Sequence, residues 1–131
     1  MKYELAPDLK EKAFDVIEKL SMNHVRKEDI ECIRSFGTST SRIIARCHGL
    51  NKVMQKALAR KAFYVLEFLS ERFDKMDEEE QIKVIIHELM HIPNAFGGGF
   101  RHHDFVTDRN VAKLYQKFIE GAYENDKNEK Y

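Results

Sequence analysis

One segment of the chain, DEEEQIKVIIHELMHIP at residues 77–93, constrains the fold more than any other. Asp77 stands three residues before Glu80, which is the spacing of a capping box, and acidic side chains fill the first turn, where the helix dipole favours them. Pro93 disfavours helical geometry in the residue before it. The segment therefore predicts a helix from Asp77 to about His91. Apolar residues take up most of its circumference, which is typical of a buried helix.

The same helix carries two histidines four residues apart. His87 and His91 project from one face about one 5.4 Å turn apart, so a ring nitrogen of each can reach one ion at roughly 2.0–2.1 Å. Glu88 lies about 100° around the helix from His87, where it can accept a proton from a metal-activated water. Burying these three side chains without partners would cost several kcal/mol, and a metal with its water supplies the partners. The pattern HELMH therefore indicates a metal centre.

A third ligand must come from another segment, because a catalytic zinc takes three protein ligands and leaves the fourth position to water. His102 and His103 return to the helix after a reversal through Gly97, Gly98 and Gly99, and Asp104 is a weaker candidate. Adjacent residues point about 100° apart on a helix and to opposite faces on a strand, so both histidines can hardly bind one ion. The residues alone leave the choice between the two histidines open.

The rest of the chain shows alternating helical and strand patterns. Residues 7–20 have apolar side chains at helical spacing and predict a first helix, and residues 102–123 predict a final one. Residues 30–36 predict a short strand that ends in a turn, and residues 63–70 predict a strand covered on both faces. Residues 38–60 fit a strand in one part and a helix in another, and are left unassigned.

Length and charge bound the possible classes of protein. The 131 residues, 43% of them hydrophobic, suit one domain, expected over residues 1–123 with a polar, frayed tail at 124–131. Twenty-two Lys and Arg balance twenty-two Asp and Glu, so net charge gives no argument for a nucleic-acid or membrane partner, although a local basic patch remains possible. The first residues lack a signal-peptide pattern, and no stretch reaches the roughly 20 apolar residues of a membrane span. The expected location is therefore the cytoplasm.

The cysteines and the two remaining histidines give no sign of chemistry. Cys32 and Cys47 lie far apart in the sequence and outside any CxxC pairing, so we expect reduced, partly buried thiols rather than a disulfide framework or a four-cysteine zinc site. His24 and His48 are interpreted as ordinary surface or turn histidines.

Two segments, SERFDKMDEEEQIKVIIHELMHIP and FGGGFRHHDF, resemble the small zincin-like metallopeptidases of archaeal and phage genomes. CIRSFGTSTSRIIARCHGL and YVLEFLSERFD resemble them more loosely, so the resemblance covers about residues 30–106. The chain is more distantly similar to the SprT-like and WLM-type zincins, in which HExxH is followed by a lone histidine that opens a later helix. That analogy implies His103 as the third ligand, with His102 as the alternative. The HExxHxxGxxH spacing of metzincins is absent.

The resemblance implies an α+β class, with a minimal zincin-like fold. A small, mostly antiparallel sheet would pack on the HExxH helix, flanked by N- and C-terminal helices. It also implies that the strand at residues 63–70 lies at a sheet edge near the cleft, where an extended substrate could pair with it. The other interpretation of this strand is a plain core strand.

The function implied is a zinc-dependent metallopeptidase that hydrolyses peptide bonds in a peptide or protein substrate. One Zn²⁺ would be held by His87, His91 and His103, with Glu88 as general base to a metal-activated water. His102, Arg101, or a tyrosine such as Tyr64 or Tyr115 are candidates for contacting the substrate or its oxyanion.

Two alternative functions remain open. One is a non-catalytic, zinc-stabilised module that binds a peptide or protein, whose sign would be a fourth protein ligand closing the metal sphere. The other is a nucleic-acid-associated protease like the SprT group, which neutral charge and the lack of an obvious basic or aromatic module disfavour.

Overall fold

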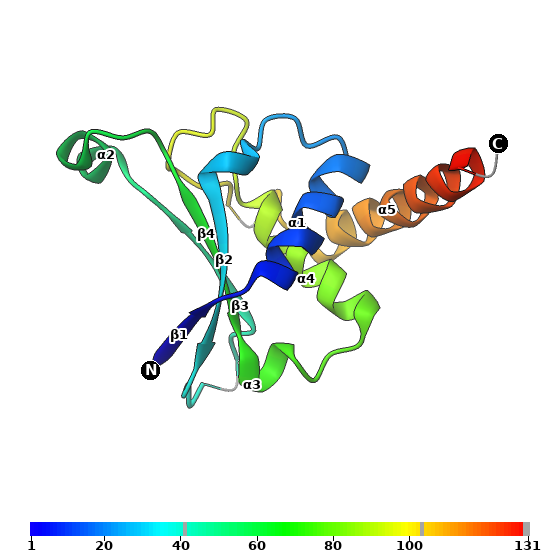
Figure 1. Ribbon diagram of the computed structural model, residues 1–131, viewed down its shortest axis with the longest axis horizontal. Coiled ribbons are helices and arrows are strands. Elements are labelled where there is room, and N and C mark those ends of the chain that lie inside the picture. Colours follow the sequence, from blue (N-terminus) through cyan, green and yellow to red (C-terminus); the bar gives the residue numbers. More distant parts are fainter. Residues whose placement is uncertain (41, 103, 130–131) are drawn as a thin grey trace.

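The computed structural model describes residues 1–40, 42–102 and 104–129 (Figure 1). Within these ranges the chain alternates between short strands and helices. The strands are β1 (Lys2–Leu5), β2 (Ile30–Phe36), β3 (Ala45–Gly49) and β4 (Tyr64–Leu69). The helices are α1 (Pro7–Lys19), α2 (Lys52–Leu58), α3 (Ser70–Phe73), α4 (Glu78–Met90) and α5 (Asp108–Glu129), with a 3₁₀ turn, η1 (Lys27–Asp29), before β2.

Most of the predicted elements are confirmed. The first helix, the strand at residues 30–36, the strand within residues 63–70 and the final helix correspond to α1, β2, β4 and α5. The unassigned residues 38–60 contain β3 and α2. β1 was not predicted, because its four residues are all exposed and too few to show a pattern. α5 continues to Glu129, beyond residue 123, after which a polar tail is expected.

The four strands form one mixed sheet in the order β1-β2-β4-β3. β1 pairs antiparallel with β2, β2 parallel with β4, and β4 antiparallel with β3. The expected α+β class with a small, mostly antiparallel sheet is therefore confirmed. Cys32 and Cys47 both lie opposite Leu66 of the intervening β4, and both are free thiols, as predicted. A whole strand separates them, which is too far for a disulfide.

The expected edge position of the strand at residues 63–70 is wrong. β4 pairs with β2 on one side and β3 on the other, so it is an interior strand. Its side chains explain this position, because Tyr64, Leu66 and Phe68 are completely buried. β3 takes the edge position instead, and its contacts with α4 place that edge beside the histidine-bearing helix.

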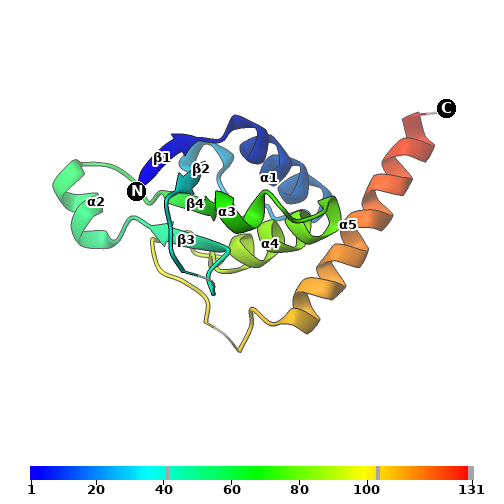
Figure 2. The ribbon, with the colours of Figure 1, turned by 90° about the horizontal axis from the view of Figure 1, so that it is seen from below.

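A layer formed by α1 and α4 covers one face of the sheet, and α5 packs on that layer (Figures 1 and 2). Within the described residues, no helical layer covers the opposite face. The core lies between the sheet and the helical layer. α1 contributes Leu9, Ala13, Val16 and Ile17, which recur at helical spacing, as the sequence predicts. α4 contributes Ile82, Ile85, Ile86, Leu89 and Met90. None of the helices, as far as the structure describes them, combines the length and apolarity needed to cross a bilayer.

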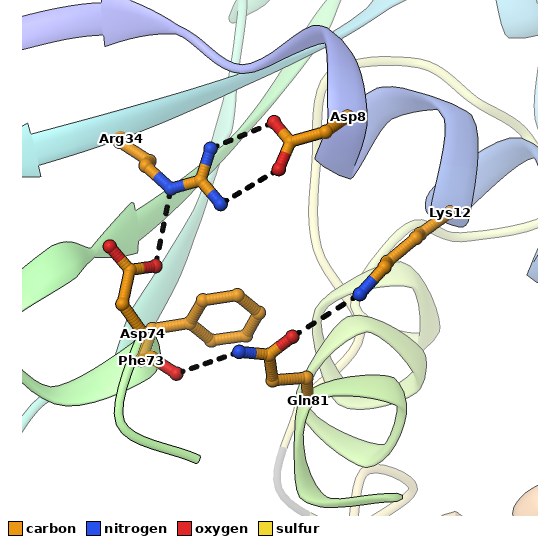
Figure 3. Close-up of polar contacts among 6 residues, drawn as sticks. All are labelled: Asp8, Lys12, Arg34, Phe73, Asp74 and Gln81. Atoms are coloured by element: carbon orange, nitrogen blue, oxygen red, sulfur yellow. Dashed lines mark hydrogen bonds and ion pairs between the residues drawn. The ribbon is translucent and has the colours of Figure 1, made fainter. Parts of the chain in front are cut away.

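Polar contacts fix the start of α4 against the rest of the fold (Figure 3). Gln81 of α4 donates to the Phe73 carbonyl at 3.1 Å and accepts from Lys12 of α1 at 3.3 Å. Nearby, the Arg34 guanidinium donates to both carboxylate oxygens of Asp8, at 2.8 and 2.9 Å, and this hydrogen bonding lowers the Asp8 pKa. These contacts connect α1, β2 and the α3–α4 segment, so α4 is held in register over the sheet.

Candidate metal centre

α4 begins and ends as the sequence predicts. The Asp77 carboxylate accepts a hydrogen bond from the Glu80 amide at 2.9 Å, which caps the first turn. The helix ends at Met90 with His91 as its C-cap, two residues before Pro93. Ile85, Ile86 and Leu89 are fully buried, so packing against the sheet fixes the rotation of the helix about its axis. The side chains of its last two turns therefore have defined directions.

His87 and His91 point their Nε2 atoms at each other. The two nitrogens are 3.3 Å apart, and the imidazole planes are inclined by 70°. Two nitrogens bound to one zinc ion at roughly 2.0–2.1 Å and a tetrahedral angle would be about 3.3–3.4 Å apart. The observed separation of the two Nε2 atoms fits one tetrahedrally coordinated ion without any change in the helix.

A backbone contact outside the helix orients His91. Its Nδ1 lies 2.9 Å from the Arg101 carbonyl oxygen, and the Arg101 amide donates to the His91 carbonyl at 2.8 Å. A carbonyl can only accept, so Nδ1 carries the proton and the ring lone pair is on Nε2. Metal-binding histidines commonly have this arrangement. No sequence pattern predicts this contact, because it depends on the path of the loop backbone.

Glu88 lies beside the two histidines but in a drier environment. It is 5% exposed, and its carboxylate approaches His87 Nε2 at 3.9 Å. Burial raises the pKa of the Glu88 carboxyl to about 7 in the absence of a bound cation. His87, Glu88 and His91 have ligand atoms within 4.8 Å of one another, which makes them a candidate metal site among the described residues. A carboxyl with this pKa is suited to both accepting and releasing a proton near neutral pH.

The candidate third ligands all come from the connection between α4 and α5. His103 lies outside the described residues. His102 and Asp104 are described, and neither belongs to the cluster of His87, Glu88 and His91. The His102 carbonyl accepts hydrogen bonds from the Phe105 and Val106 amides, at 3.1 and 3.2 Å, so this residue opens the turn that leads into α5.

The residues named as oxyanion candidates have other partners. The Tyr64 hydroxyl donates to the Gly99 carbonyl at 2.7 Å and accepts from the Gly98 amide at 2.9 Å. It therefore holds the glycine loop, residues 97–99, rather than facing the cluster. The Arg101 guanidinium lies 4.2 Å from the centre of the Phe105 ring. Tyr115 packs beneath Lys83, whose ammonium is 5.1 Å from the ring centre.

The glycine loop packs closely against the end of β3. Gly98 has φ +102°, and a Cβ there would collide with the Leu50 carbonyl oxygen. A Cβ on Gly49 would lie 2.7 Å from the Gly98 carbonyl oxygen. Both glycines are needed for this close approach, which fixes the loop that leads from α4 to Arg101.

The other two histidines differ from each other. His24 Nε2 lies 3.2 Å from the Ile92 carbonyl oxygen, a contact in keeping with an ordinary turn histidine. His48 is half-exposed on β3, but its Nε2 lies 2.7 Å from Glu67, which is buried. Burial alone would raise the Glu67 pKa. Contacts with Ser35 and His48 outweigh that effect and lower it. The His48–Glu67 pair could not be foreseen while residues 38–60 had no assigned structure.

A groove of about 690 Å³ runs along α4 beside His87 and Glu88. The segment leading into β3 forms one wall, and the first turns of α5 form another. Most of its lining is apolar, with four charged side chains and one histidine among the apolar ones. The lining residues are Arg42, Ile43, Ile44, Ala45, Lys83, Val84, His87, Glu88, Asp108, Val111 and Ala112. None of the residues on the two outer walls was recognised from the sequence, because they come from separate segments that only the fold brings together.

Comparison with known proteins agrees with the chemistry of this cluster. The family described as "Putative phage metallopeptidase" matches residues 1–125, nearly the whole chain. No curated protein and no solved structure matches the chain. The family match includes the complete fold, from β1 through most of α5, and the His87–Glu88–His91 cluster lies inside it. The chain therefore belongs to this family.

Proposed function

We propose that the protein is a zinc-dependent peptidase of the zincin type, which binds one Zn²⁺ through His87, His91 and His103. The single observation that carries this proposal is the 3.3 Å separation of the two Nε2 atoms with a buried carboxylate beside them. A closed structural site needs only ligands. The presence of a buried carboxylate, Glu88, next to the ligand pair favours catalysis.

The catalytic role falls to Glu88. A zinc ion at this site supplies a Lewis acid that polarises the scissile carbonyl and makes water more acidic. The Glu88 carboxylate takes the proton from the attacking water and passes it to the leaving amine. The Arg101 carbonyl keeps His91 in the tautomer that directs its lone pair away from the loop.

His103 is proposed as the third ligand because of its position in the chain. Its neighbours Arg101 and His102 bring the connection back to the end of α4, since the Arg101 amide bonds to the His91 carbonyl. The ligand count of a catalytic zinc site requires one more donor than α4 provides. His102 is the alternative.

The groove beside Glu88 is the proposed binding site for an extended peptide. β3 has one strand neighbour, β4, among the described strands, so its other edge can pair with a substrate backbone. The apolar lining from Ile43, Ile44 and Val111 suits apolar substrate side chains.

Two sets of variants test the proposal. Glu88→Gln should keep its zinc and lose proteolysis of a casein-type substrate, because the amide cannot accept the proton. Unchanged proteolysis would rule out the role given to Glu88, and zinc binding without any proteolysis in the wild type would favour the non-catalytic binding module. His103→Ala should lose zinc in metal analysis of the purified protein, whereas His102→Ala should retain it. The reverse result would exchange the two assignments.

A further inference from the structure

α2 lies at the end of an arm that projects away from the body of the molecule. The arm comprises residues 50–61, between β3 and β4, and Figures 1 and 2 both show it at the far end from α5. None of the α2 residues is buried. The arm therefore adds almost nothing to the core that holds the fold together.

The arm nevertheless has a defined structure. The Asn51 side chain caps α2 by accepting from the Met54 amide at 2.9 Å. Gln55 donates to the carbonyls of Leu50 and Gly97, at 2.7 and 2.9 Å, and so anchors the helix to the glycine loop. These contacts present the outer face of α2 in a fixed orientation.

Large apolar side chains on that outer face have no cover. Val53 is 77% exposed, Met54 45% and Leu58 56%. Their spacing, together with exposed Ala57, places them on one side of the helix. Clustered exposed apolar side chains commonly mark an interaction surface.

Positively charged side chains lie along one side of the arm, next to this apolar face. Lys52, Lys56, Arg60 and Lys61 line a shallow hollow on the arm, which no acidic residue lines. Arg60 pairs with Asp29 at 3.3 Å, and the other three cations have no ion-pair partner in the part of the chain that the structure describes. The bias extends further, because residues 32–66 contain seven Lys and Arg and no Asp or Glu.

We propose that the arm docks on an anionic lipid surface. Cations attract an anionic membrane, and adjacent apolar side chains enter its interfacial region, so one partner accounts for both features. Nucleic acid would account for the cations alone, since the arm has no aromatic residue on which a base could stack. A protein interface of ordinary size uses roughly 20–30 residues on each side, more than the arm offers.

Tryptophan fluorescence tests the insertion directly, because the chain contains no tryptophan. In Val53→Trp the only indole would stand on the outer face of α2. With mixed phosphatidylcholine–phosphatidylglycerol vesicles its emission should shift to the blue, and with pure phosphatidylcholine vesicles it should not. Ile119→Trp, at a 41% exposed position on α5, is the matched control and should not shift with either.

Charge variants test the electrostatic part of the proposal. Each neutralised cation near an anionic surface should weaken binding about fivefold, so Lys52→Gln with Lys56→Gln should lower vesicle co-sedimentation about 25-fold. Lys113→Gln with Lys117→Gln removes the same charge from exposed positions on α5 and should have little effect. Binding of wild type should also fall with added salt.

Three results would overturn the proposal. The first is failure of the wild type to sediment with anionic vesicles at low salt. The second is an equal loss in the arm and α5 charge variants, which would show attraction to the whole chain. The third is tighter binding to duplex or single-stranded DNA than to anionic vesicles at the same salt, which would assign the arm to nucleic acid.

Discussion

Glu88 is buried next to two imidazoles, and its burial has a consequence for stability in the metal-free protein. An unfolded chain ionises this carboxyl above its usual pKa of 4.5, whereas the folded chain keeps it protonated up to about pH 7. Between these values the folded state binds more protons, so the free energy of unfolding falls as pH rises through this window. Above pH 7 the free energy of unfolding is lower than at pH 4.5 by at most about 3 kcal/mol through this effect.

Glu88→Gln should remove this loss. After zinc has been chelated, we expect the variant to gain stability relative to wild type when the pH is raised from about 5 to about 8, by up to about 3 kcal/mol. Urea unfolding of both proteins at the two pH values measures the change. Glu11→Gln, at an exposed position on α1, is the control and should follow wild type at both. A difference between Glu88→Gln and wild type that does not vary with pH would contradict the argument.

At the level of single residues, the sequence predicts the geometry of the site best where a helix alone determines it. His87, Glu88 and His91 were predicted to meet because the helical repeat puts them together, and α4 confirms that placement. The Arg101 carbonyl, which orients His91, was not predicted. Its position depends on how the glycine loop packs against β3, a long-range contact that leaves no local pattern.

Among the elements, the groove between β3, α4 and α5 is the proposed binding site for substrate side chains. Ala112 lines this groove from an exposed position on α5, so a larger side chain can be accommodated there without disturbing the core. Ala112→Phe should fill part of the groove and lower kcat/KM for peptide hydrolysis by roughly tenfold, about 1.4 kcal/mol. The zinc content should stay unchanged.

Kinetics with a fluorogenic peptide measures kcat/KM, and metal analysis measures the zinc content. Ala112→Ser changes the same position without adding bulk, and it should retain most of the wild-type kcat/KM. Full activity in Ala112→Phe would show that the substrate approaches Glu88 from another side.

The position of a strand within the sheet does not follow from its own side chains. The side chains of β4 correctly predicted a strand, but its neighbours in the sheet depend on β3, which lies in a segment with no clear pattern. An edge and an interior position differ in partners rather than in local sequence. The resemblance to zincins implied an edge strand beside the site, and that role belongs to β3.

For the whole molecule, the balanced net charge hides a strong separation of positive from negative residues along the chain. The balance of 22 cations and 22 anions gives no argument for a nucleic-acid or membrane partner, yet residues 32–66 carry a net charge of +7, so the rest of the chain carries −7. Much of the positive part is the exposed arm. Local attraction follows the distribution of charge over the surface, which the net charge of the chain does not describe.

Zinc binding should also stabilise the molecule as a whole, because the proposed ligands join α4 to the connection that leads into α5. A ligand that binds only the folded state adds about 4 kcal/mol when its free concentration is a thousand times its Kd. Chelation should therefore lower the Tm by roughly 15 °C for a domain of this size. Differential scanning calorimetry with and without a chelator measures the shift. His91→Ala removes a ligand, and its Tm should not respond to the chelator. A chelator-induced Tm shift of the same size in wild type and His91→Ala would place the stabilising ion elsewhere in the molecule. No Tm shift in either protein would show that packing alone joins α4 and α5.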